Sequence, residues 1–159
     1  TVELITSDHR ERQLEKALQP LKAKYDLIFI DCPPSLGMLT VNAFVASDGI
    51  LVPMQAEFYA VEGLSQLITT TKRVKKLYNE ELNIVGILIT MYNKRLLLSM
   101  QVMDELQKYY PDKLFSTCIS RNVKLSEAPG FGKPGYYHDK HSKGAQEYLD
   151  VAKELVLRV

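Results

Sequence analysis

Short apolar runs rich in β-forming residues alternate along this chain with amphipathic helical patterns. The clearest runs are residues 26–31 (DLIFID), 49–53 (GILVP) and 84–91 (IVGILITM), and a weaker one lies at 114–119. An uninterrupted apolar run is typical of a strand that is buried on both faces, as in a parallel sheet. Because the segments between the runs are long enough to cross over as helices, the pattern predicts an α/β fold: a mostly parallel sheet with helices on both faces.

Helical spacing of apolar residues marks the intervening segments. Residues 10–23 predict a surface helix that Pro20 weakens in its last turn. Three further apolar stripes predict helices around residues 61–77, 102–106 and 148–156. With 159 residues, 46% of them hydrophobic, the chain is long enough for one core, and we predict a single domain over residues 1–159.

Charge and cysteine spacing exclude several classes of function. The formal net charge is +1, so no overall field favours nucleic acid or a membrane, and any such partner must meet a local patch. Cys32 and Cys118 form no metal-binding or redox pair and are typical of reduced thiols. No run of about 18 uncharged apolar residues is present to span a bilayer. These features predict a cytoplasmic protein with no membrane partner.

Asp31 closes the apolar run 26–31, and it is the first residue whose position indicates chemistry. Ligands of open α/β sheets gather at the carboxyl ends of the strands. A carboxylate there can hold Mg²⁺, usually through a water molecule, because magnesium prefers oxygen ligands and keeps part of its hydration shell. The alternative is an aspartate that only stabilises the following turn.

Three segments in the same order carry a resemblance to a known family. They are YDLIFIDCPPSLG at 25–37, PMQAEFYAVEGLSQL at 53–67 and RNVKLSEAPGFGKP at 121–134. Together they resemble the ParA/Soj family of partitioning ATPases, the deviant-Walker branch of the MinD/ParA superfamily. The resemblance runs from about residue 10 to about residue 155. It implies a three-layer fold like that of P-loop NTPases.

The resemblance assigns roles to the stretch that begins at Asp31. Asp31 matches the family's catalytic Walker B-like residue, which lies near Mg²⁺. Pro33, Pro34, Ser35 and Gly37 match a switch that senses the nucleotide. The residue types agree with a switch, since prolines restrict the backbone and glycine permits conformations closed to other residues. A loop built in this way can hold a few discrete states.

Adenine contacts are the next role that the resemblance implies. The matching positions are Asn93, Arg121 and Asn122, with Ser120 beside them. Two departures stand out: relatives commonly have proline at the position of Ser120, and Asp-Ala-Arg where Asn93 begins Asn-Lys-Arg. Arg121 and Asn122 can equally be structural residues that hold the loop through backbone hydrogen bonds.

DNA binding is implied at Arg95 and Lys124, which match basic positions that contact DNA in relatives. Basic residues outnumber acidic ones between residues 91 and 143, so the local charge agrees. Contacts of this kind go to phosphates and carry no base information. The basic run TKRVKK at 71–76 is better explained as the solvated face of a helix.

The family's phosphate-binding loop, with the pattern KGGxGKT, does not occur in this sequence. GFGKPG at 130–135 follows no predicted strand, and we interpret 129–135 as a loop. We therefore expect the C-terminal portion of a partitioning ATPase without its N-terminal strands and P-loop. ATP or ADP and Mg²⁺ would belong to the intact protein, and this chain alone would bind them poorly, if at all, and hydrolyse nothing.

An absent central strand would leave residues 26–31 and 49–53 with open edges, because that strand lies between them in relatives. Such edges recruit other backbone. Either a separate piece fills the gap, or the two segments pair directly or across a dimer.

The leading hypothesis is an ATPase of plasmid or chromosome partitioning. It would dimerise with ATP and Mg²⁺, bind nucleoid DNA without sequence preference, and be stimulated to hydrolyse ATP by a ParB-like partner. One alternative is a non-catalytic interaction module of a partition system that lacks the P-loop. Another is a MinD-like membrane-cycling ATPase. The mixed charges of residues 144–159 disfavour that last alternative, because a membrane helix would be rich in lysine.

Overall fold

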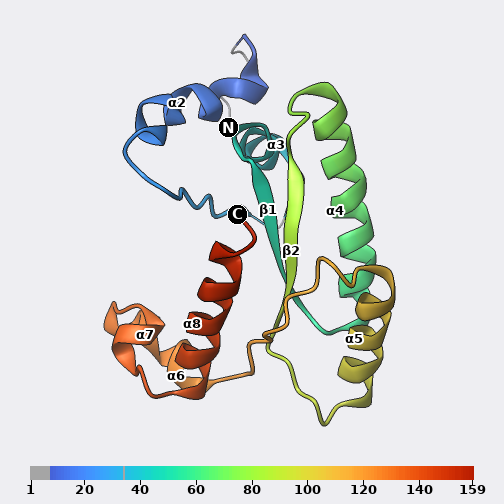
Figure 1. Ribbon diagram of the computed structural model, residues 1–159, viewed down its shortest axis with the longest axis vertical. Coiled ribbons are helices and arrows are strands. Elements are labelled where there is room, and N and C mark those ends of the chain that lie inside the picture. Colours follow the sequence, from blue (N-terminus) through green and yellow to red (C-terminus); the bar gives the residue numbers. More distant parts are fainter. Residues whose placement is uncertain (1–7, 34) are drawn as a thin grey trace. The chain divides into compact units, whose positions relative to one another are not determined.

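The computed structural model describes residues 8–33 and 35–159 (Figure 1). The chain divides into two compact units. The first unit comprises Thr1–Ile50 and Leu64–Asn83, and the second comprises Leu51–Gly63 and Ile84–Val159.

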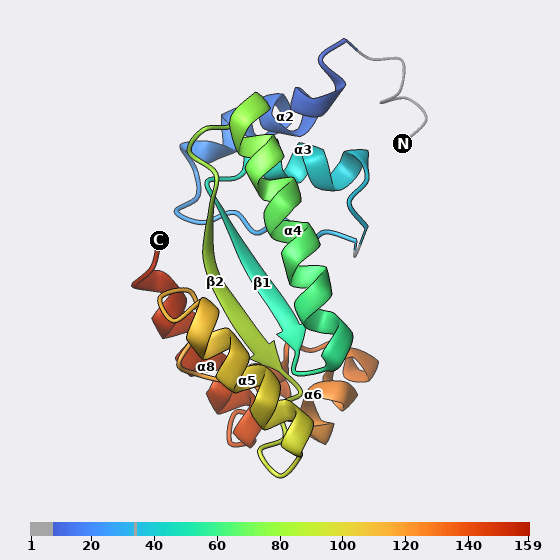
Figure 2. The same ribbon diagram turned by 90° about the vertical axis from the view of Figure 1, so that its right-hand side faces the viewer.

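A parallel sheet is the centre of the second unit. Strands β1 (Gly49–Gln55) and β2 (Asn83–Thr90) are hydrogen-bonded neighbours and run in the same direction (Figure 2). Helix α4 (Phe58–Leu77) connects them along the chain. The predicted strands at 49–53 and 84–91 and the parallel α/β architecture are therefore confirmed.

The segment 113–120 pairs with β2 less regularly than the weak apolar run predicts. Two isolated parallel bridges, Ile87 with Leu114 and Tyr92 with Ser120, join it to β2 and the residues that follow β2. Four backbone hydrogen bonds between the two segments measure 2.7–2.9 Å. The segment thus runs beside β2 as an irregular third strand.

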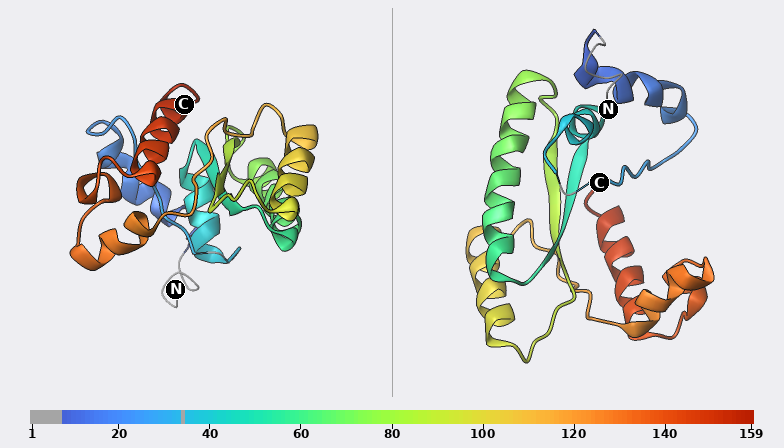
Figure 3. Two further views of the ribbon diagram at one scale, coloured as in Figure 1. Left: turned by 90° about the horizontal axis from the view of Figure 1, so that it is seen from below. Right: turned by 180° about the vertical axis from the view of Figure 1, so that it is seen from behind.

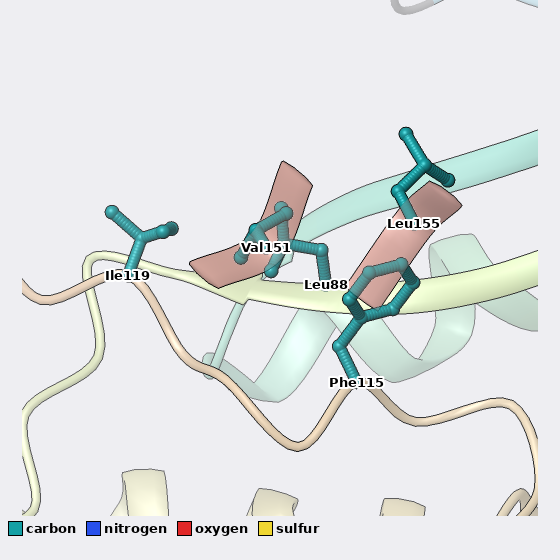
Figure 4. Close-up of a cluster of buried hydrophobic side chains, with 5 residues drawn as sticks. All are labelled: Leu88, Phe115, Ile119, Val151 and Leu155. Atoms are coloured by element: carbon teal, nitrogen blue, oxygen red, sulfur yellow. The ribbon is translucent and has the colours of Figure 1, made fainter. Parts of the chain in front are cut away.

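Helices α5 (Leu97–Tyr109) and α8 (Lys143–Val156) lie on opposite sides of β2 (Figures 1 and 3). Leu88 on β2 packs with Phe115 and with Val151 and Leu155 of α8 (Figure 4). Side chains alternate between the two faces of a strand, so Ile87 and Ile89, both buried, point to the side where α5 lies. Burial on both faces explains why β2 reads as one continuous apolar run.

Shorter elements join α5 to α8. They are α6 (Val123–Glu127), the 3₁₀ turn η2 (Ala128–Phe131) and α7 (Gly135–His138). The prediction of a plain loop at 129–135 missed these turns. At Gly132, φ is +62°, a left-handed conformation that favours glycine.

The first unit packs a 3₁₀ turn, η1 (Arg10–Arg12), and helix α2 (Gln13–Lys22) against helix α3 (Met38–Ala46). Buried Asn42 joins them: its Nδ2 donates to the Arg10 carbonyl at 2.8 Å, and its Oδ1 accepts from the Leu14 N–H at 3.1 Å. The predicted helix at 10–23 is confirmed with its first residues in the 3₁₀ form. Pro20 lies inside α2, two residues before the helix ends.

Asn79 holds the carboxyl end of α3. Its Nδ2 lies 3.0, 3.3 and 2.7 Å from the carbonyl oxygens of Phe44, Val45 and Ser47. The Phe44 and Val45 carbonyls belong to the last turn of α3 and have no partner inside the helix, so this amide supplies donors to the helix end. An apolar cluster beside it combines residues of α3, α4 and the strand ends: Phe44, Val45, Val74 and Leu82, with Val41, Ile50 and Leu67 packed against them.

Helix α3 was not predicted from the sequence. Its residues, MLTVNAFVA, are apolar nearly all round, and those from Asn42 to Ala46 are all buried. A helix enclosed on most sides shows no amphipathic stripe, so the periodicity that marks α4, α5 and α8 is absent.

The prediction of a buried strand at residues 26–31 is wrong for this structure. No strand forms there, and Leu27, Ile28 and Phe29 are 47%, 39% and 73% exposed. Among residues 8–33 and 35–159, no segment offers this stretch a strand ladder, and an extended chain without one cannot satisfy its backbone groups as sheet. The direct pairing of 26–31 with 49–53 does not form here either.

No helix in the described part of the chain is long and apolar enough to cross a membrane.

Candidate functional site

The predicted site residues divide between the two units. Asp31, Pro33, Ser35 and Gly37 belong to the first unit, and Pro34 lies outside the described residues. The second unit holds the remaining predicted residues: Asn93, Arg95, Arg121, Asn122 and Lys124.

Asp31 lies in an exposed extended segment and does not end a strand in this structure. Cys32 follows it, half-buried, with its thiol 3.8 Å from the Ile30 carbonyl. Burial raises the pKa of the Cys32 thiol, and the neighbouring Asp31 carboxylate raises it further. The thiol therefore stays protonated near neutral pH and is no nucleophile.

Ser35 and Gly37 lead into α3. The Ser35 carbonyl accepts a hydrogen bond from the Thr40 hydroxyl, and the Gly37 carbonyl accepts one from the Val41 N–H at 3.0 Å. Gly37 has φ −84° and ψ −173°, an extended conformation that any residue adopts. The special freedom of glycine, expected from the sequence, is therefore not used at this position in this structure.

The donor chemistry of this stretch fits magnesium. The Asp31 carboxylate and the Ser35 hydroxyl are both oxygen donors, which Mg²⁺ prefers, and both residues are exposed. An exposed carboxylate leaves room for the water molecules that Mg²⁺ retains. The role of Asp31 at a metal stays a prediction.

The second part of the predicted site lies where β2 and the segment 113–120 end. The Tyr92 N–H donates to the Ile119 carbonyl at 2.9 Å, and Tyr92 and Ser120 form a parallel bridge. Asn93 and Arg121 follow these two residues directly. The fold thus brings Asn93, Arg121 and Asn122, which were predicted together as adenine contacts, to neighbouring strand ends.

Both asparagines also shape their own loops. The Asn93 Oδ1 accepts from the Arg95 N–H at 3.1 Å, and the Asn122 Oδ1 accepts from the Lys124 N–H at 2.9 Å, where it caps α6. Capping of this kind supports the structural interpretation of Asn122 that the sequence left open. Arg121 is exposed.

The two basic residues predicted to contact DNA follow the same strand ends. Arg95 is exposed, and Lys124 is paired with Glu127 at 2.9 Å. The hydrogen bond with Glu127 raises the pKa of Lys124 and lowers the pKa of Glu127. His138 Nε2 lies 3.5 Å from the same carboxylate and stacks on Phe131. Lys124 is charged, but a local anion already engages it.

Two glutamates of α8 that hold the segment 113–120 were not singled out from the sequence. Glu147 accepts hydrogen bonds from the N–H and hydroxyl of Ser120, and Glu154 accepts them from the N–H and hydroxyl of Ser116. The sequence showed them only as charges on a mixed polar face. Their spacing of two helical turns places them on one face, but the serines they contact lie far away in sequence.

Comparison with known proteins places the chain in a family. A family model described as an AAA domain matches residues 1–84. The chain is 51% identical to the sporulation initiation inhibitor protein Soj of Bacillus subtilis over 97% of this chain and 61% of that protein. It is 49% identical to the chromosome partitioning protein ParA of Myxococcus xanthus over 99% of this chain and 56% of that protein.

A solved structure agrees with the fold. Cobyrinic acid a,c-diamide synthase from Mycobacterium smegmatis, with a bound ATP analogue and magnesium, superposes with a TM-score of 0.78 at 31% identity, over 98% of this chain and 56% of that chain. The chain therefore spans about 60% of the length of the relatives it matches. From its sequence and its parallel α/β architecture, the chain belongs to the Soj/ParA family of partitioning ATPases.

Proposed function

We propose that this chain forms part of an ATP-dependent partitioning protein and supplies two parts of its nucleotide site. The observation that carries the proposal is the parallel bridge between Tyr92 and Ser120, which brings polar residues from two strand ends together. Ligands of α/β sheets bind at such ends. The bound ATP analogue and magnesium of the M. smegmatis synthase are consistent with this type of ligand.

Each part has a distinct task in the proposal. Magnesium, when bound, neutralises charge on the phosphates, and Asp31 would hold it through a water molecule. Pro33 to Gly37 would respond to the terminal phosphate, because that stretch joins Asp31 to the first turn of α3. Asn93, Arg121 and Asn122 would contact the base.

The phosphate cradle is proposed to come from residues other than 1–159. A Gly-rich loop supplies backbone N–H groups and lysine to phosphates, and this sequence has no such motif. The exposed apolar residues Leu27, Ile28 and Phe29 support this, since a neighbouring strand would complete the backbone hydrogen bonds of the segment and let it join a sheet whose faces are covered. Residues 1–159 alone would therefore bind ATP poorly.

DNA would be bound through Arg95 and Lys124 after two copies dimerise around the nucleotide. The contacts would go to phosphates and carry no sequence preference. Hydrolysis, stimulated by a partition partner, would release the DNA, and the protein would act in the cytoplasm on the nucleoid.

The test is ATP hydrolysis by the protein expressed from its complete reading frame, with DNA present. Asp31→Asn should lower kcat by about 100-fold, because the neutral side chain holds Mg²⁺ weakly. Asp26→Asn is the matched control, an exposed aspartate at the start of the same segment, and it should change kcat less than twofold. Equal loss in both variants, or no hydrolysis by the unaltered protein, would reject the proposal.

A further inference from the structure

Helix α8 holds the irregular strand 113–120 through two contacts of the same chemistry. Glu147 accepts from the Ser120 N–H at 2.7 Å and from the Ser120 hydroxyl at 2.8 Å. Glu154 accepts from the Ser116 N–H at 3.0 Å and from the Ser116 hydroxyl at 2.7 Å. Each glutamate thus satisfies both the backbone and the side chain of one serine.

The spacing of the two contacts fits an antiparallel arrangement of helix and strand. Seven residues of α-helix rise about 10 Å, and four extended residues span about 13 Å. The pairs therefore lie at the two ends of the strand, with Ser120–Glu147 at the end where the base-contacting residues follow. Cys118 lies between them: burial raises the pKa of its thiol, and both glutamates contribute.

A second feature ties the same end of α8 to the same loop. Gly144, buried one turn before Glu147, lies so close to the loop that an added Cβ would be 2.6 Å from Leu125 Cδ1 and 3.0 Å from Asn122 Cβ. Real Cβ atoms essentially never approach a neighbour within 3.0 Å. The first turns of α8 therefore contact the residues on both sides of Arg121.

We infer that Glu147, acting through Ser120, is a positioning residue that holds Arg121 and Asn122 in place for the nucleotide base. The inference rests on the proposed function, because it assigns a task to those two residues. Ser120 directly precedes Arg121. The two hydrogen bonds from Ser120 to the Glu147 carboxylate therefore fix the position of the backbone that leads into Arg121. Glu154 has no such consequence, since Ser116 is five residues from Arg121 and faces the opposite end of the strand.

Glu154 is a matched control from the same helix. The side chains of Glu147 and Glu154 are 16% and 17% exposed, and each has one cation near it, Lys143 and Arg158. A purely structural role predicts that the two truncations act alike. A positioning role predicts that only the Glu147 truncation changes nucleotide affinity.

The experiment measures the Kd for a fluorescent ATP analogue with Mg²⁺, and the Tm, in the protein from its complete reading frame. Glu147→Ala should weaken binding about tenfold, and Glu147→Gln, which keeps an acceptor oxygen, should restore it to within about threefold. Glu154→Ala should lower the Tm at least as much but change the Kd less than twofold. If Glu147→Ala does not fold, Gly144→Ala takes its place, because its added methyl group would crowd the Leu125 side chain at 2.6 Å and the Asn122 Cβ at 3.0 Å while leaving the carboxylate intact.

Two results overturn the inference: equal weakening by the Glu147 and Glu154 variants, or no weakening by Glu147→Ala and Gly144→Ala in a protein that binds the analogue. Absence of binding by the unaltered protein would instead reject the proposed function. Selective loss in the Glu147 or Gly144 variant, with Glu154→Ala unaffected, supports the positioning role.

Discussion

The segment around Asp31 and the strand end around Ser120 carry similar sequence signals but are held differently. Each is an apolar run that leads into polar residues. Residues 113–120 pair with β2 and are fixed by two glutamates of α8. Residues 26–31 have no strand partner in the described chain and leave Phe29 73% exposed.

This difference shows that an apolar run indicates a segment suited to a buried strand. Whether the strand forms depends on whether neighbouring strands are present. A strand needs neighbours on its edges before its backbone can leave water. Where β2 supplies that neighbour, even the weak run at 114–119 becomes ordered structure. Where none is supplied, the stronger run at 26–31 stays exposed.

The largest expected effect compares the buried core around β2 with the exposed segment 26–31 in the polypeptide 1–159. Leu88→Ala should lower the free energy of unfolding by about 3 kcal/mol, because Leu88 is 3% exposed and packs against α8. Phe29→Ala should change it by less than about 0.5 kcal/mol, since the ring is mostly in water. Urea unfolding measures both, and similar costs for the two substitutions would contradict the contrast.

Local sequence patterns predict many of the elements, but they do not predict contacts between residues that lie far apart in the sequence. Elements with one apolar face, such as α4, α5 and α8, are visible in the periodicity, and the buried strands are visible as runs. Helix α3 shows no such periodicity, because most of its surface is buried. The Glu147–Ser120 contact joins residues 27 positions apart, so no local pattern encodes it.

DNA affinity should depend on Arg95, which lies just after β2. Arg95→Ala should weaken binding to duplex DNA about tenfold and reduce the salt dependence by about one phosphate contact. Fluorescence anisotropy at several salt concentrations measures both quantities. Lys72→Ala, on the solvated face of α4, is the control and should leave both unchanged. Equal losses at the two positions would mean that the charge acts without a defined site.

A smaller effect, in the opposite direction, is expected at Glu127. Glu127→Gln removes the anion that pairs with Lys124 at 2.9 Å, so the lysine becomes available to phosphate. DNA affinity should rise about threefold, with a steeper dependence on salt. An unchanged or lower affinity in the same anisotropy assay would indicate that Lys124 does not contact DNA.

The smallest effect concerns the pH dependence of stability. Burial alone would raise the pKa of Glu154, but hydrogen bonds from Ser116, Arg158 and Thr117 lower it overall. A carboxyl whose pKa is lower in the folded state stabilises the fold above its unfolded pKa of about 4.3, and this stabilisation is lost as pH falls through the folded pKa. Thermal unfolding of Glu154→Gln between pH 7 and pH 3 should therefore show a shallower acid decline than the unaltered chain. An identical decline would contradict this reading of the contact.

The most direct test measures the binding of magnesium ATP. It compares the polypeptide 1–159 with the protein from its complete reading frame. If a phosphate cradle outside these residues completes the site, the complete protein should bind the nucleotide at least about 100-fold more tightly and be the only one of the two to hydrolyse it. Hydrolysis by the polypeptide 1–159 at a rate like that of the complete protein would contradict the division of the site proposed above.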